Sequence, residues 1–80
     1  MGAQIKLRKR YRTDWFRVIV QLQYQGYSQA RVARILGVSL TTLRGWKDGS
    51  EPAHNFGHAL LELWSEVIQQ PICERPMTFD

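Results

Sequence analysis

A single glycine, Gly37, separates two short segments that each have the apolar spacing of a helix and each begin after a serine. Glycine adopts positive φ without the steric penalty of a Cβ, so Gly37 predicts the end of one helix and a sharp turn. Ser28 and Ser39 are expected to cap the two helices, because a serine hydroxyl accepts a hydrogen bond from the free N–H groups of a first turn. The sequence therefore predicts helices over residues 29–36 and 40–47.

The two predicted helices have apolar faces that can pack on each other. The first helix has its apolar residues at three- and four-residue spacing on one face: Val32, Ala33 and Leu36. Ala33 is small enough to let a second helix cross closely. Leu43 and Trp46 form the buried side of that second helix, and Val38 is expected to fill the corner between them.

The rest of the second helix forms an outward, polar face. A leucine or threonine methyl group can contact the methyl group of thymine, and an arginine can bond the edge of guanine or a phosphate. This pattern favours a helix-turn-helix that binds double-stranded DNA, and the alternative is an ordinary helical hairpin with an exposed polar face. The expected DNA contacts from this segment are Ser39, Leu40, Thr41, Thr42, Arg44 and Lys47.

Length and composition limit the chain to one small domain. Its 80 residues, 44% of them hydrophobic, suffice for one core but not for two. Cys73 is the only cysteine, so no intrachain disulfide can form, and we expect a cytoplasmic setting. No apolar run is long enough to span a bilayer, and no signal-type apolar block follows the basic N-terminus, so we expect no membrane insertion.

Two further helices complete a predicted all-α fold, a small bundle of four or five helices with the option of a short strand at the N- or C-terminal end. One helix is expected from Thr13, as its cap, to about Gln25, and another over residues 53–69. Pro71 and Pro76 bracket a tail that we expect to be extended or loosely ordered. The predicted division is a basic arm (1–12), a helix-turn-helix domain (13–70) and a C-terminal tail (71–80).

Charge is distributed very unevenly along the chain. Residues 1–50 carry ten Lys or Arg against two acids, whereas residues 51–80 carry one Arg against five acids. Five cations precede the first predicted helix and are expected to contact DNA as an arm, through phosphates or the minor groove: Lys6, Arg8, Lys9, Arg10 and Arg12. The alternatives are a solvated tail, or a short edge strand, because Ile5 and Leu7 alternate with basic residues.

The last predicted helix has more apolar surface than one core face requires. A narrow arc holds Phe56, Leu60, Leu63 and Val67. Leu61, Trp64 and Ile68 widen the apolar sector to one side, where Gly57 would permit close approach. We therefore predict a homodimer interface at Leu61, Trp64 and Ile68. The alternative is that the N-terminal segment or the C-terminal tail covers Trp64 within the same chain.

The stretch GYSQARVARILGVSLTTLRGWKDGSEP, followed by HALLELW, resembles the lambda repressor/Cro-like family of helix-turn-helix proteins, especially small phage and bacterial regulators. The resemblance covers about half of the chain. It implies a transcriptional regulator, a repressor that acts as a dimer on a palindromic operator in a bacterial cytoplasm, nucleoid or phage-infected host.

The resemblance also implies roles for single residues. Gln29 is expected to bond a phosphate or to support the first residue of the recognition helix, while Ser39, Leu40, Thr41 and Arg44 face the major groove. Leu40 departs from a frequent glutamine, so a Gln-to-Gln bridge to Gln29 cannot form. Gly45 departs too; we interpret it as room for close approach of the helix backbone to DNA or as a weakened helix end.

Enzymatic chemistry finds little support in the sequence, and we expect no catalysis, cofactor, metal or small-molecule ligand. His54, His58 and Glu62 are spaced one helical turn apart, but without an HExxH pattern or a second cysteine they are expected to be surface residues.

Two alternative functions remain. One is a phage-type adaptor or inhibitor that binds another protein through the last helix, and the other is a DNA-recruiting subunit of a recombination, replication or packaging complex.

Overall fold

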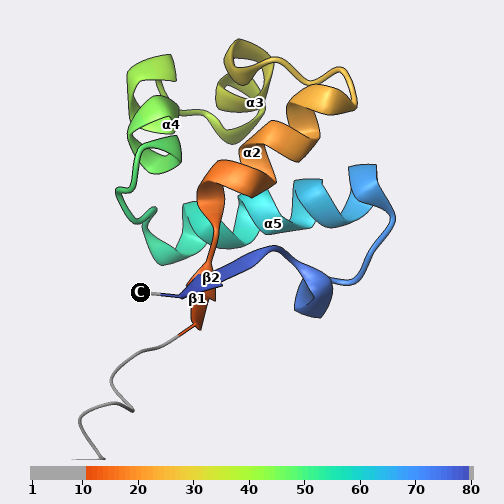
Figure 1. The fold of residues 1–80 in the computed structure, drawn as a ribbon. Coiled ribbons are helices and arrows are strands. Elements are labelled where there is room, and N and C mark those ends of the chain that lie inside the picture. Colours follow the sequence, from red (N-terminus) through yellow and green to blue (C-terminus); the bar gives the residue numbers. More distant parts are fainter. Residues whose placement is uncertain (1–10, 80) are drawn as a thin grey trace, which may run out of the picture.

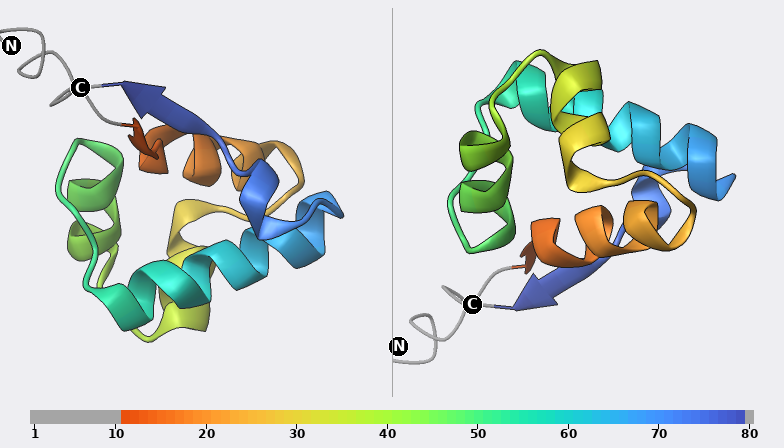
Figure 2. Two further views of the ribbon diagram at one scale, coloured as in Figure 1. Left: turned by 90° about the horizontal axis from the view of Figure 1, so that it is seen from below. Right: turned by 90° about the horizontal axis from the view of Figure 1, so that it is seen from above.

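The computed structural model describes residues 11–79, a mostly helical chain with one short sheet (Figure 1). Its elements are, in order, β1 (Tyr11–Thr13), α2 (Trp15–Tyr24), α3 (Gln29–Leu36), α4 (Leu40–Lys47), α5 (His54–Ile68), the 3-10 turn η1 (Ile72–Glu74) and β2 (Met77–Phe79). The four α-helices surround a common centre, and β2 lies outside this ring (Figure 2). No helix within residues 11–79 is long and apolar enough to cross a membrane.

The core fills the centre of the ring with side chains from all four α-helices. The buried apolar residues are Trp15, Val18, Ile19, Leu22, Val32, Ala33, Leu43, Trp46, Leu60, Leu61 and Trp64. Because each helix buries one apolar face here, the helices position one another, and the predicted small helical bundle is confirmed at that level.

A two-stranded antiparallel sheet joins the two ends of the described residues, so the fold is not purely helical. Tyr11 lies opposite Phe79 and Thr13 lies opposite Met77. The rings of Tyr11 and Phe79 stack with centroids 4.3 Å apart, and Arg75 Nε donates a hydrogen bond of 2.7 Å to Thr13 Oγ1. The optional terminal strand is thus present at both ends, and the C-terminal tail is ordered by pairing with β1.

Because of this sheet, the cap of α2 lies one residue later in the chain than predicted. Thr13, the expected cap, belongs to β1 instead, and the side chain of Asp14 caps the helix by accepting a hydrogen bond of 3.1 Å from the Arg17 N–H. The Asp14 N–H in turn donates to the Pro76 carbonyl at 2.9 Å. The strand therefore displaces the predicted cap by one residue.

The prediction of a dimer interface at Leu61 and Trp64 is wrong, because both side chains are buried within the chain. Leu61 is 9% exposed and Trp64 is 2% exposed, and Ile68 packs partly buried against the same core. Trp64 Nε1 donates a hydrogen bond of 2.8 Å to Gln21 Oε1 on α2. The apolar sector of α5 is wide because α2, α3 and η1 all pack on this helix.

Gly57 permits close approach, but to a residue of its own chain. A Cβ on Gly57 would lie 3.2 and 3.4 Å from the Trp15 ring and 3.6 Å from Pro52 Cγ. Trp15 is buried, and its Nε1 lies 3.5 Å from Glu51 Oε2. Gly57 therefore lets α5 and the first turn of α2 touch.

We expect Gly57→Ala to lower the free energy of unfolding by roughly 1 kcal/mol. Overpacking costs about 1–3 kcal/mol, while the helix preference of alanine offsets up to about 1 kcal/mol. Gly45→Ala is the matched control, because a Cβ there would meet only Ser50 Oγ at an ordinary 3.7 Å. The control should stabilise the chain by about 0.5–1 kcal/mol. Urea unfolding followed by tryptophan fluorescence measures both, and equal stabilisation by the two changes would contradict the packing argument.

Candidate nucleic-acid interface

The turn between α3 and α4 is set by one cap at each helix and one left-handed residue. Ser28 Oγ accepts a hydrogen bond of 3.1 Å from the Arg31 N–H at the start of α3. Gly37 ends α3 with φ +75°, and the Val38 N–H donates to the Ala33 carbonyl at 3.0 Å. Val38 packs half-buried against the core. The predicted bounds of α3 and the role of Gly37 are confirmed.

Ser39 fixes the start of α4 through two hydrogen bonds. Its Oγ accepts from the Thr42 N–H at 3.0 Å and donates to Thr42 Oγ1 at 2.9 Å. These two residues, both predicted DNA contacts, lie at the exposed start of α4 with their hydroxyls bonded to each other. Their first role is to define the helix start.

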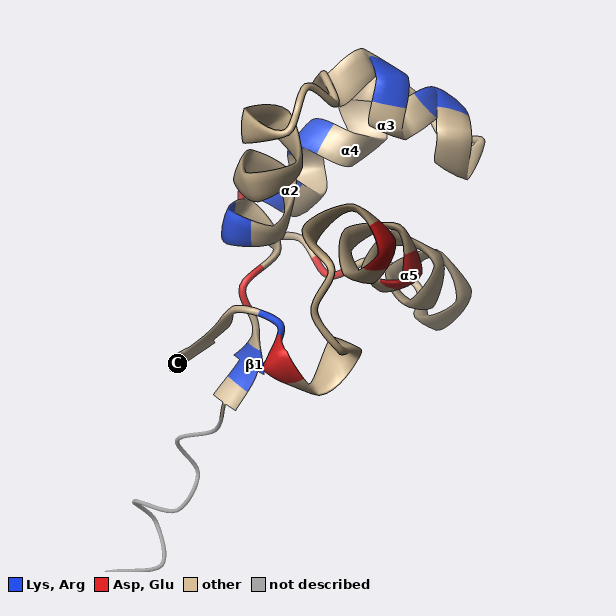
Figure 3. Cartoon of the chain, turned by 90° about the vertical axis from the view of Figure 1, so that its right-hand side faces the viewer, with Lys and Arg blue, Asp and Glu red and all other residues tan. Residues whose placement is uncertain are grey.

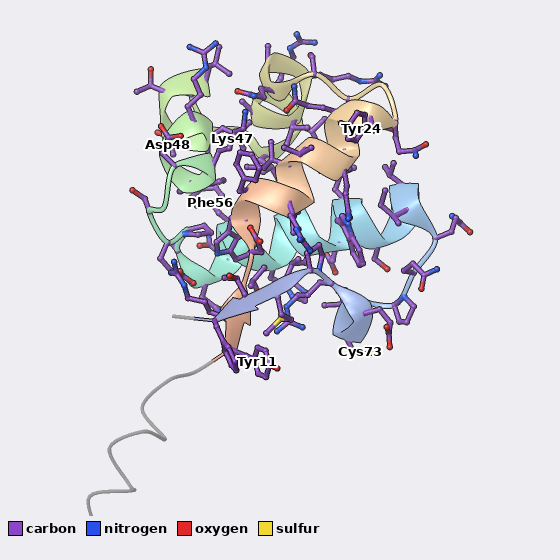
Figure 4. The ribbon with its side chains drawn as sticks, viewed as in Figure 1. Tyr11, Tyr24, Lys47, Asp48, Phe56 and Cys73 are labelled. Carbon is purple, nitrogen blue, oxygen red and sulfur yellow. The ribbon has the colours of Figure 1, made fainter. Side chains whose placement is uncertain are left out.

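The buried side of α4 holds it firmly against the bundle. Leu43 and Trp46 are in the core, and Ala33 of α3 is buried beside them. The Trp46 ring lies with its centroid 6.0 Å from that of Phe56, whose side chain is on α5 below α4 (Figure 4). The predicted packing of Leu43 and Trp46 is therefore confirmed, and it determines which side chains of α4 point outward.

Thr41 and Arg44 are exposed on the outer face of α4. Leu43 and Trp46 occupy the opposite face of the same helix, because residues three and four apart share a face. Within residues 11–79 Arg44 makes no ion pair. Its guanidinium is thus available to a ligand.

Leu40 and Lys47 lie at the edges of this face and are half-buried. Lys47 Nζ is 5.4 Å from the centroid of the Phe16 ring, so the cation rests against an aromatic residue at the start of α2. Lys47 is labelled at the end of α4 nearest α5 (Figure 4). The contact with Phe16 was not predicted, because the sequence does not show that α2 begins beside the end of α4.

Gln29 forms a different side-chain bridge from the one considered above. Its Nε2 donates a hydrogen bond of 3.2 Å to Gln23 Oε1 on α2. Gln29 is half-buried in this position at the start of α3. The bridge ties α3 to α2 rather than to Leu40.

Two exposed arginines of α3 were missed as candidates. Arg31 and Arg34 are both exposed, and the guanidinium carbon of Arg31 lies 4.3 Å from the centroid of the Tyr27 ring. Their three-residue spacing in QARVARIL was the available signal. Lys and Arg occur on α3 and α4, which contain no acid, whereas the charged residues of α5 are acidic (Figure 3).

The predicted N-terminal arm is described only at its last residues. Lys6, Arg8, Lys9 and Arg10 lie outside the described residues. Arg12 does not belong to an arm: it lies in β1, and its Nη1 is 3.5 Å from Glu51 Oε1. The strand holds Arg12 because residue 12 pairs with Thr78 across the sheet.

One of the two histidines of α5, His58, pairs with a neighbouring acid. His58 Nε2 lies 3.2 Å from Glu62 Oε2, and both side chains are exposed. Within residues 11–79 no three His, Cys, Asp or Glu side chains are grouped so that they could hold a metal ion.

The candidate interface comprises Thr41 and Arg44 on the outer face of α4, Lys47 at the edge of that face, and the exposed Arg31 and Arg34 of α3. Comparison with protein-family models, with curated proteins and with solved structures found no match to this chain.

Proposed function

We propose that the chain is a sequence-specific double-stranded DNA-binding regulator in which α3, the turn at Gly37 and α4 act as a helix-turn-helix. The observation that carries the proposal is the exposure of Thr41 and Arg44 on a helix whose other face is fixed in the core. A major groove admits one α-helix, and a helix held by the protein core enters it in a defined orientation.

The chemistry of this face suits the edges of base pairs. Arginine donates two hydrogen bonds to the O6 and N7 atoms of guanine, and the methyl group of threonine packs against that of thymine. Arg44 has no ion pair to break within residues 11–79, so binding to a base does not remove an interaction from the folded chain. Thr41 lies one helical turn before Gly45 and adds an apolar contact beside the base contact of Arg44.

The charge of the surrounding surface supports binding to phosphates. Arg31 and Arg34 are exposed on α3, which packs against α4, and neither helix contains an acid. Each cation that neutralises a phosphate releases bound counterions and favours association at low salt. Lys6, Arg8, Lys9 and Arg10 extend this proposal to an N-terminal arm.

Regulation by repression, as a dimer on a palindromic operator, is part of the proposal and is supported by the sequence resemblance. Selection of bound duplexes from a random library tests it, since an inverted repeat with half-sites about one helical turn apart is expected for a two-fold dimer. A recruiting subunit of a recombination or replication complex would use the same DNA contacts. The adaptor alternative loses the support of Leu61 and Trp64 of α5, because both side chains are buried.

Arg44→Ala should weaken binding to the selected duplex by about 1–3 kcal/mol if the guanidinium contacts a base edge. Binding to an unrelated duplex should change much less, because only the specific complex contains that contact. Fluorescence anisotropy at constant salt measures both affinities.

Arg17→Ala is the matched control for this change. It removes the same charge from an exposed arginine that belongs to α2 and not to α4, and Arg17 Nε lies 3.8 Å from Asp14 Oδ2. The base-contact role of Arg44 is refuted if the two variants lose affinity equally, or if Arg44→Ala leaves specific binding unchanged.

Gly45→Ala should lower the affinity for the selected duplex several-fold while raising the stability of the fold. Gly45 shares the outer face with Thr41, and no contact inside the chain requires a glycine there. A methyl group would therefore obstruct only an approaching DNA backbone. Unchanged affinity measured by anisotropy would show instead that Gly45 merely weakens the helix end.

Replacing Lys6, Arg8, Lys9 and Arg10 together with glutamine should flatten the salt dependence of DNA binding. The slope of log affinity against log salt changes by about 0.9 for each phosphate of B-form DNA that the variant no longer neutralises. Binding titrations at several salt concentrations give this slope for both chains. An unchanged slope would show that these four residues do not contact phosphates, without affecting the proposal for α4.

A further inference from the structure

An open groove with both apolar and acidic lining lies on the side of the bundle formed by α3, α5 and η1. Its volume is about 490 Å³, and it is lined by Ile35, Glu62, Leu63, Ser65, Glu66 and Ile72. Ile35 is 51% exposed although it is a large apolar residue, and Leu63 and Ile72 are only partly covered. The apolar side chains of this groove therefore have area left to bury against another chain.

The rim of the groove is acidic. Glu62 and Glu66 are exposed one helical turn apart on α5, and no Lys or Arg lines the groove. Glu62 contacts His58, whereas the Glu66 carboxylate makes no ion pair within residues 11–79. A complementary ligand therefore combines apolar side chains with closely spaced cations.

We propose that this groove binds residues 5–10 of a second copy of the chain. The segment IKLRKR has this composition: Ile5 and Leu7 alternate with Lys6 and Arg8. Successive side chains of an extended segment point to opposite sides. Ile5 and Leu7 can then contact Ile35, Leu63 and Ile72 while the cations meet the acidic rim.

The register of the sheet favours a second copy over the same chain. Thr13 pairs with Met77 and Tyr11 with Phe79, so the chain traced backwards from Thr13 runs away from η1. β1 contacts the chain where α5 begins, through Arg12 and Glu51, whereas the groove lies along the second half of α5, at Glu62 and Glu66. Residues 1–10, if extended, span up to roughly 33–36 Å, enough to enter the groove of an adjacent molecule.

Reciprocal exchange of the two segments closes a two-fold dimer, whereas exchange in one direction links copies head to tail. Lys6 and Arg8 cannot contact these carboxylates and DNA phosphates at the same time. Self-association and DNA therefore compete for one segment, although docking itself does not depend on the DNA-binding proposal.

Cys73 provides a probe beside the groove, since it is exposed on η1 next to Ile72 (Figure 4). A nitroxide is attached to Cys73 of the full chain without isotope labelling. This chain is mixed, without DNA, with a 15N-labelled chain that carries the substitution Cys73→Ser. We expect the amide signals of residues 5–10 of the 15N-labelled chain to lose most of their intensity and to recover when the nitroxide is reduced. High salt should also restore them, because it screens the exposed charges.

Glu62→Gln and Glu66→Gln, made together in the nitroxide-bearing chain, should restore most of this intensity. Asp48→Asn is the control: it removes an exposed acid from the end of α4 and should not restore the intensity. Unbroadened signals in the mixed sample contradict docking to a second copy. If residues 5–10 are then broadened only when nitroxide and 15N are in one chain, the segment binds its own groove instead. Broadening that persists when both Glu62→Gln and Glu66→Gln are present contradicts the role of the acidic rim.

Discussion

The burial of Leu43 and Trp46 is the interaction on which the exposed surface of this protein depends. Both side chains lie in the core with Ala33, and Ser39 fixes where α4 begins. A helix held at its start and along one face can present only its remaining side chains to solvent. The outward direction of Thr41 and Arg44 is therefore a result of core packing.

Much of this arrangement could be predicted from local chemistry. Ser28, Gly37 and Ser39 mark helix ends by hydrogen bonding and by φ preference, which neighbouring residues decide. The bounds of α3 and α4 accordingly agree with the sequence prediction, as does the buried side of α4. The exposure of Thr41 and Arg44 follows from the same periodicity.

The remaining features depend on contacts between distant parts of the chain. The apolar sector of α5 indicated how much surface it buries but not against what, so Leu61 and Trp64 were assigned to a partner although α2 and the rest of the core cover them. Gly57 was likewise explained by a second molecule when Trp15 was its neighbour. The pairing of Thr13 with Met77 is equally non-local. The bridge from Gln29 to Gln23 spans only six residues, but it depends on the path of the turn between α2 and α3.

The pairing of Tyr11 with Phe79 places both ends of the folded part side by side, far from each other in sequence. Along the sequence, the four α-helices of the described residues lie between two paired strands of three residues each. A force that pulls these two ends apart separates the strands one residue pair at a time, beginning at Tyr11 and Phe79, before it acts on the core. The ends of the chain can therefore detach while the hydrophobic interior stays closed.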